Sequence, residues 1–224
     1  MKEVKAVAFD CDGVLAANDS SWQNIHDYFG TENKEMLAKF IRKEVTEEEF
    51  VLDDIRLWTE VQPEIHRDDI MRCYSGIKLM PGAREVVEEL QNRGVLVAIV
   101  SSGVDLLIGS IANMLKVDDW AANGFEWDEE GWLIGSKPTV VQSHDKGITV
   151  EKFARINSID PENIVSVGDS GPDLSMMIPG SRFIGFNPAP NRGAEDFVKA
   201  GVPVIEGQDL RDIWQPMFGE SFPK

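Results

Sequence analysis

Short apolar runs rich in β-branched residues recur along the chain and alternate with stretches of helical periodicity. Each run has almost no polar position, which is typical of strands that are buried on both faces of a parallel sheet. Five such strands are predicted, at Val4–Phe9, Val95–Val100, Ile164–Val167, Phe183–Phe186 and Val202–Ile205.

A helix is predicted just before the second of these strands. Pro81 and Gly82 suit its start, Gly94 suits its end, and apolar side chains between them follow the i, i+3, i+4, i+7 spacing of one helix face. These apolar residues are Ala83, Val86, Val87 and Leu90. Because helices and strands alternate, the chain is predicted to form βαβ units in a Rossmann-like, doubly wound parallel α/β sheet.

Residues 17–78 interrupt this alternation, because they contain only helical patterns. Thr46 followed by Glu49 is a capping box, in which each side chain accepts a backbone N–H of the other residue. The helix after it is predicted to bury one face formed by Phe50, Leu57, Trp58 and Val61. We therefore expect an α-helical cap at 17–78, inserted into a Rossmann-like core of residues 1–16 and 79–224.

The composition indicates a folded domain with a strong negative charge. The 224 residues are 42% hydrophobic, which is enough for one large domain or for a domain with a smaller insert. The formal net charge is −17, so neither nucleic acid nor an anionic membrane is an expected partner. The same charge repels phosphate esters. A phosphate site would therefore need local positive charge from a metal ion, a lysine or backbone N–H groups.

Cysteine usage and the apolar runs point to a cytoplasmic protein. The two cysteines, Cys11 and Cys73, have a spacing that matches neither a zinc site nor a disulfide framework, which fits a reducing compartment. The apolar stretch near the N-terminus is too short for a signal peptide, and no run is long enough to cross a bilayer. The sequence is compatible with any oligomeric state.

Polar side chains gather at the ends of three predicted strands and before one helix. Taken singly, each has an ordinary explanation, such as a solvated acidic loop, a turn or a surface lysine. Ligands of open α/β sheets bind at the carboxyl ends of the strands, so the topology brings these side chains to one edge. They are Asp10 and Asp12 after the first strand, Ser101 and Ser102 after the second, Lys146 before a helix, and Asp169 and Asp173 after the third.

The carboxylates predict metal-assisted phosphoryl chemistry. Asp10, Asp12 and Asp169 supply hard oxygen ligands, which suit Mg²⁺. The metal would join protein and phosphate and neutralise the charge that repels a carboxylate nucleophile. Asp10 would attack phosphorus and form an aspartyl-phosphate. Asp12 points the same way two residues further on, and it would protonate the leaving alcohol and then accept a proton from water.

The remaining residues of this set predict a phosphate site. The Ser101 hydroxyl can hydrogen-bond a phosphoryl oxygen, and the N–H groups of Ser102 and Gly103 can add to it at the start of the next helix. Lys146 offers a point charge to the same oxygens. These groups are the local positive features that an acidic protein needs in order to bind phosphate.

Together these residues resemble the four motifs of the haloacid dehalogenase superfamily of phosphatases. The first motif is matched by Asp10-x-Asp12-Gly13, the second by Ser101, the third by Lys146-Gly147, and the fourth by Gly168-Asp169 with Asp173. The resemblance covers both ends of the core and implies a cap where the helical insert is predicted. It also implies that Asp173 supports the metal site.

Within that superfamily the chain is most similar to the phosphoserine phosphatase group. It shares a helical cap after the first motif, a short hairpin, here predicted over 124–135, and the segments 173–176 and 185–188. The resemblance implies that a cap acid and a cap arginine hold the serine moiety, positions that Asp19 and Arg56 match best. It therefore implies hydrolysis of a small phosphorylated metabolite, with phosphoserine, and hence serine biosynthesis, favoured.

Three departures from the group concern the substrate. Gly13 and Val14 replace a Ser-Thr pair, Ser102 replaces a glycine, and Pro172 replaces an asparagine. A phosphatase or phosphotransferase that acts on another small organic phosphate is therefore an alternative. A non-enzymatic alternative is a receiver-like phospho-signalling domain, which also joins paired acids, a hydroxyl and a lysine but needs no cap.

Overall fold

A six-stranded sheet forms the centre of the computed structural model, which describes residues 2–188 and 193–223. The strand order is β3-β2-β1-β6-β7-β8, and all neighbouring strands are parallel. The five predicted strands are confirmed, and β3 is a further strand that the sequence analysis missed. The strands are β1 (Ala6–Phe9), β2 (Leu96–Val104), β3 (Asp119–Asn123), β6 (Ile164–Gly168), β7 (Arg182–Phe186) and β8 (Val204–Ile205).

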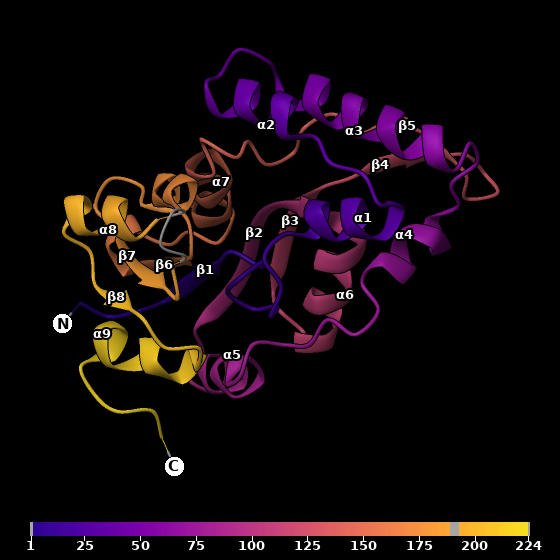
Figure 1. Cartoon of the computed structure of the whole chain (residues 1–224). Coiled ribbons are helices and arrows are strands. Elements are labelled where there is room, and N and C mark those ends of the chain that lie inside the picture. The colour runs from indigo at the N-terminus through magenta and orange to yellow at the C-terminus, as the bar shows by residue number, and fades with distance from the viewer. Residues whose placement is uncertain (1, 189–192, 224) are drawn as a thin grey trace.

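The sheet is doubly wound, as predicted, with helices on both faces (Figure 1). In the buried strand β1, Val7 and Phe9 belong to one apolar cluster and Ala6 and Ala8 to the other, because alternate side chains lie on opposite faces. The Val7 face is covered by α5 (Ala83–Asn92), α6 (Asp105–Leu115), η3 (Leu210–Ile213) and α9 (Trp214–Phe218), and the Ala6 face by α7 (Gly147–Ile156) and α8 (Ala194–Ala200). Two further 3₁₀ helices are η1 (Pro161–Asn163) and η2 (Gly171–Met176).

The segment between β1 and α5 is helical, as predicted. It contains α1 (Ser21–Phe29), α2 (Lys34–Ile41), α3 (Glu47–Val61) and α4 (Arg67–Cys73). Figure 1 shows α2 and α3 side by side above the rest of the chain. The hairpin of β4 (Phe125–Trp127) and β5 (Leu133–Ser136) is confirmed and packs against α3. Since this hairpin comes from the segment assigned to the core, a cap limited to 17–78 stays a prediction.

The start of α3 is confirmed, and its predicted buried face is confirmed at Trp58 but not at Val61. Thr46 and Glu49 form both hydrogen bonds of the capping box. Val61, however, is 55% exposed, and the buried residues of α3 are Asp54 and Trp58. The inner side of the helix packs on the hairpin, where Trp58 meets the edge of Phe125 at 5.8 Å between ring centroids. Asp54 lies one helical turn from both Phe50 and Trp58, so the predicted face carries a buried carboxylate between its apolar residues.

Within the described part of the chain, no helix is both long and apolar enough to span a membrane.

Candidate active site

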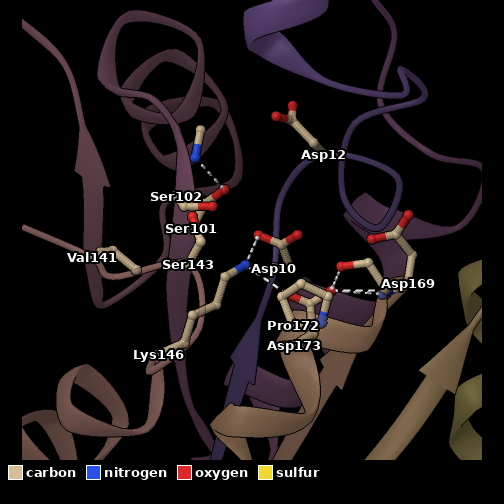
Figure 2. A network of polar contacts seen from close by, with 12 residues as sticks. Asp10, Asp12, Ser101, Ser102, Val141, Ser143, Lys146, Asp169, Pro172 and Asp173 are labelled. Atoms are coloured by element: carbon tan, nitrogen blue, oxygen red, sulfur yellow. Dashed lines mark hydrogen bonds and ion pairs between the residues drawn. The ribbon is translucent and has the colours of Figure 1, made fainter. Parts of the chain in front are cut away.

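Asp10 stands at the carboxyl end of β1, at the edge where the predicted residues meet. Its backbone N–H donates to the carbonyl oxygen of Val167 at 2.9 Å, which continues the pairing of β1 with β6. This contact brings Asp10 beside the loop that carries Asp169 and Asp173. Figure 2 shows the Lys146 ammonium directed at Asp10 from the opposite side.

Lys146 is buried between two carboxylates. Its Nζ lies 3.1 Å from Asp10 Oδ1 and 2.6 Å from Asp173 Oδ1. The backbone holds it there, since the Lys146 N–H donates to Ser175 Oγ at 3.0 Å. A Cβ on Gly147 would lie 2.5 Å from the Ser175 carbonyl oxygen, so glycine is needed where α7 approaches η2.

This arrangement changes the proton affinity of both groups. Burial raises the pKa of Asp10 to about 7; the Lys146 charge opposes this change, and the Asp173 and Asp12 carboxylates add to it. Burial alone would lower the pKa of Lys146, but the charges of Asp10 and Asp173 raise it, so the ammonium keeps its proton. Without a metal, the site therefore pairs a permanent cation with a carboxylate that titrates near neutrality.

Asp173 organises the loop between β6 and η2. Its Oδ2 accepts hydrogen bonds from the N–H groups of Asp169 at 3.2 Å and Ser170 at 3.0 Å, and from Ser170 Oγ at 2.7 Å. Its Oδ1 accepts from Lys146. Both oxygens of Asp173 are thus hydrogen-bonded to protein groups. This fits the predicted role of Asp173, which is to position the residues around a metal ion.

A group of carboxylates at this edge fits a divalent metal ion. Oxygens of Asp10, Asp169 and Asp173 lie within 4.8 Å of one another. Hard oxygen donors of this kind suit Mg²⁺. Three carboxylates face one lysine, so the ionised group carries an excess of negative charge that a divalent cation would neutralise.

Asp12 lies near this group, but its carboxylate is held in another direction (Figure 2). Oδ2 accepts from the Ser21 N–H at 2.8 Å and from Ser21 Oγ at 2.7 Å, and Oδ1 accepts from Asn18 Nδ2 at 2.9 Å. The three clustered carboxylates described above do not include Asp12. Its assignments as metal ligand and as proton carrier stay predictions.

Ser21 contacts the predicted site residue Asp12, and this contact was not predicted from the sequence. It is fully buried, and its Oγ accepts the Val104 N–H at 2.9 Å while donating to Asp12. The signal in the sequence is the Ser20-Ser21 pair at the start of α1: Ser20 caps the helix, which leaves the Ser21 hydroxyl for Asp12. Ser21 therefore joins the cap to the loop after β1 and to the end of β2.

Ser101 and Ser102 lie within β2, not after its end as predicted, because pairing with β3 extends the strand to Val104. Ser101 is buried, and its Oγ accepts the Gly103 N–H at 3.2 Å. The predicted N–H contribution of Gly103 at a helix start is therefore wrong, since that N–H is used by Ser101 and α6 begins only after Val104. Figure 2 shows Ser101 on the Lys146 side of Asp10.

Gly13 is required by the position of Asp169. Its φ is +77°, and a Cβ there would lie 2.5 Å from Asp169 Oδ2. Any larger residue would combine a strained backbone with displacement of a predicted metal ligand. Gly13, which departs from the serine of the phosphoserine phosphatase group, thus leaves room for the Asp169 carboxylate.

A cavity of about 490 Å³ lies between the cap helices and the core. Its core side includes Ser102, Asn123 and Ser143, which adjoin the predicted phosphate-binding residues Ser101 and Lys146. Its cap side combines aromatic and acidic side chains from α1, α2 and α3. Among these are Trp22, Phe40, Phe50, Glu47 and Asp54.

The two predicted substrate residues of the cap lie elsewhere. Arg56 is exposed on α3 and forms ion pairs with Asp53 at 3.0 Å and Glu60 at 2.6 Å. Asp19 is exposed and lines a separate hollow beside α1. Neither residue lines the cavity next to Ser102, so their role toward a substrate stays a prediction.

Comparison with known proteins assigns the chain to a family. A family model described as haloacid dehalogenase-like hydrolase matches residues 4–179. The chain is 30% identical over 215 residues to phosphoserine phosphatase of Methanocaldococcus jannaschii, which covers 95% of this chain and 97% of that protein. It is also 30% identical over 188 residues to phosphoserine phosphatase of Archaeoglobus fulgidus, covering 83% of this chain and 53% of that protein.

Solved structures agree with this placement. A substrate-bound phosphoserine phosphatase complex superposes with a TM-score of 0.76 at 26% identity, covering 97% of this chain and all of that one. A phospho-aspartyl intermediate analogue of phosphoserine phosphatase gives a TM-score of 0.75 at 28% identity over 96% of this chain. The enzymatic prediction is thereby confirmed over the receiver-like alternative. The chain belongs to the haloacid dehalogenase-like hydrolase family and is a phosphoric monoester hydrolase.

Proposed function

We propose that this enzyme is a Mg²⁺-dependent phosphomonoesterase that transfers the phosphoryl group of a small organic phosphate to Asp10 and then to water. One observation carries the proposal. The Asp10 carboxylate, buried at the end of β1, is paired with Lys146 at 3.1 Å and lies within 4.8 Å of carboxylate oxygens of Asp169 and Asp173.

Asp10 acts as the nucleophile in the first step. One carboxylate oxygen bonds to phosphorus while the bond from phosphorus to the substrate oxygen breaks, and Asp12 gives its proton to the leaving alcohol. In the second step a water oxygen bonds to phosphorus, Asp12 accepts the water proton, and the Asp10–phosphorus bond breaks. Free phosphate leaves, and both aspartates return to their starting states.

The other residues bind and orient the phosphoryl group. Ser101, Ser102 and Lys146 hold its oxygens, and Asp173 keeps Lys146 in place through the 2.6 Å ion pair. Asp10 and Asp169 would hold Mg²⁺, with Asp12 as the third predicted ligand. When bound, the metal neutralises charge on the phosphate so that a carboxylate can approach it.

The relatives support phosphoserine as a substrate, and with it a role in serine biosynthesis. The outward position of Arg56 supports the second candidate, a different small organic phosphate, because this arginine is the one that the resemblance assigned to the serine carboxylate. A cytoplasmic location is part of the proposal and is supported by Cys11 and Cys73, which are both unpaired in the structure.

The test is phosphate release from a panel of phosphorylated metabolites, measured with Mg²⁺ and after chelation. We expect release that requires Mg²⁺ and is abolished in Asp10→Asn, whereas Asp27→Asn, on the exposed side of α1, retains activity. Full activity of Asp10→Asn with Mg²⁺ would refute the nucleophile. Appearance of a second phosphorylated alcohol in place of free phosphate would indicate a phosphotransferase.

A further inference from the structure

A buried carboxylate in the cavity wall has no role in the phosphoryl chemistry. Asp54 of α3 is only 1% exposed and lines the 490 Å³ cavity. Its Oδ1 accepts hydrogen bonds from His26 Nε2 at 3.1 Å and from Asn33 Nδ2 at 2.6 Å. The two donors come from α1 and from the start of α2, so three cap helices converge on one acidic group.

His26 beside Asp54 is neutral, because its other nitrogen must accept hydrogen bonds. The indole N–H of Trp58, which can only donate, points at His26 Nδ1 at 3.2 Å, and the Thr31 hydroxyl lies 2.8 Å from the same nitrogen. Nδ1 therefore carries no proton, and the proton sits on Nε2 and is donated to Asp54. Asp54 thus has two neutral donors and no cationic partner among them.

The second oxygen of Asp54 is left for a ligand. No residue in the described part of the chain donates a hydrogen bond to Oδ2, while both donors use Oδ1. This oxygen can accept a hydrogen bond from an ammonium group that enters the cavity. An anionic group there would meet a carboxylate instead.

The other charged groups of the cavity wall also favour a cationic ligand over an anionic one. The only lysine or arginine among its described lining residues is Lys34, which is 81% exposed and already paired with Glu32 at 2.7 Å. Glu47 lies closer to the core, where its carboxylate accepts hydrogen bonds from the backbone N–H and the hydroxyl of Ser143. A carboxylate on a substrate would therefore meet acidic groups in this cavity and no cation that is not already paired.

Aromatic rings complete the wall. Trp22 and the stacked pair Phe40 and Phe50, whose centroids are 5.2 Å apart, all line the cavity. Aromatic faces attract ammonium groups, including alkylated ones, through their negative π-surfaces. The Trp22 indole N–H donates to the Ser102 carbonyl oxygen at 3.0 Å, which ties this wall to the strand that carries Ser101.

We infer that the alcohol released by this enzyme carries a positively charged ammonium group and no carboxylate. The phosphate end is held at Ser101 and Lys146, and the ammonium end lies in the cap cavity with Asp54 as its counter-ion. The inference rests on the proposed function, because it assigns the substrate class of the same site. Asp54 is a specificity-determining residue in this scheme and takes no part in the bond changes.

The test compares three small esters that differ in one group each: phosphoethanolamine, phosphoserine and 2-hydroxyethyl phosphate. Phosphoserine adds a carboxylate to phosphoethanolamine, and 2-hydroxyethyl phosphate replaces the ammonium by a hydroxyl. We expect kcat/KM for phosphoethanolamine, or for its trimethylated form phosphocholine, to exceed both others by about tenfold or more. Equal or faster turnover of phosphoserine or of 2-hydroxyethyl phosphate would overturn the inference.

Two variants separate this role from a structural one. Asp54→Asn keeps an oxygen for His26 but removes the charge, so it should lose about tenfold in kcat/KM for the ammonium ester and little for p-nitrophenyl phosphate. Glu60→Gln, an exposed acid on the same helix that pairs with Arg56, is the control and should leave the ratio of the two substrates unchanged. Should Asp54→Asn fail to fold, Phe50→Leu keeps an apolar side chain but removes the ring, and should lower turnover of phosphocholine selectively. An unchanged ratio in the folded variants would contradict the assignment.

Failure of the inference can be told apart from failure of the proposed function. Release from p-nitrophenyl phosphate without ammonium preference refutes only the substrate class. Should no ester be hydrolysed, the phosphatase proposal fails, and titration calorimetry of the wild-type protein then decides the inference alone. Tighter binding of phosphoethanolamine than of phosphoserine supports it, and the reverse order overturns it.

Discussion

Ser21 Oγ lies 2.7 Å from Asp12 Oδ2, so the first residue of α1 holds the predicted proton carrier of the core. The same hydroxyl accepts the Val104 N–H at the end of β2. The predicted cap is thus joined to the sheet edge that carries the predicted site by two hydrogen bonds of one buried hydroxyl.

We expect Ser21→Ala to lower kcat about tenfold, because Asp12 loses a donor and can turn away from the leaving group. The Val104 N–H would lose its acceptor, which should cost about 1–3 kcal/mol of unfolding free energy. Rates across pH and denaturant unfolding measure the two effects. Ser20→Ala is the control: it removes only the helix cap, so a comparable fall in kcat there would show that the effect is structural.

Gly13→Ala tests whether Gly13 leaves the space that the Asp169 carboxylate needs. The new Cβ would lie 2.5 Å from Asp169 Oδ2 at a φ of +77°, so we expect displacement of that carboxylate and weaker Mg²⁺ binding, by about tenfold or more. Gly30→Ala is a matched control, because its φ is +66° but no atom lies within 4 Å of the added Cβ. It should cost about 1 kcal/mol of stability and leave Mg²⁺ affinity intact. Equal affinities for all three proteins would contradict the prediction.

Lys146→Ala should be among the most damaging single changes. It leaves the buried Asp10 and Asp173 carboxylates without their cation, which should cost about 3–5 kcal/mol of unfolding free energy at neutral pH. Turnover should fall by about a hundredfold or more, because the phosphoryl group loses a charged contact. Lys152→Ala on the exposed side of α7 is the comparison, and a stable, active Lys146→Ala protein would refute the ion-pair argument.

The raised pKa of Asp10 predicts how metal-free stability depends on pH. Because the pKa is about 7 in the folded protein and 3.8 ordinarily, the folded state binds the proton more tightly. This contribution is fully present below about pH 4 and is lost as the pH rises through 7. Residue 10 cannot titrate in Asp10→Asn. With chelator present, the unfolding free energy of this variant relative to wild type should therefore rise by at least about 1 kcal/mol between pH 4 and pH 8. Unfolding curves at both pH values measure this gain, and a constant difference would contradict it.

The same proton should compete with the proposed Mg²⁺. If Asp10 is a ligand it must be ionised to bind the metal, so Mg²⁺ affinity should rise as the pH increases toward 7 and level off above it. Calorimetric titration at several pH values checks this, with proton release detected below pH 7. An affinity that does not change between pH 5.5 and 8 would show that another group controls binding.

The sequence by itself determined five strands of the sheet and the edge at which the predicted site residues meet. Strands such as Ala6–Phe9 are buried on both faces, so nearly all their residues are apolar, and local composition is enough to find them. The carboxyl ends of parallel strands share one edge, so Asp10, Lys146 and Asp169 could be brought together from topology alone. The short strand Asp119–Asn123 lacked this signal, because it begins with exposed residues.

Only the tertiary structure decided which charged groups of the helical segment are buried. Asp54 lies on the same face of α3 as Phe50 and Trp58, and packing on the distant hairpin buries its carboxylate, whereas Arg56 on the opposite side stays in solvent. The Ser21–Asp12 contact and the neutral state of His26 likewise depend on neighbours far apart in sequence. Burial of a charged group is a property of its surroundings. The gathering of acidic and basic residues at the strand ends could therefore be predicted from the sequence, whereas the burial of Asp54 required the fold.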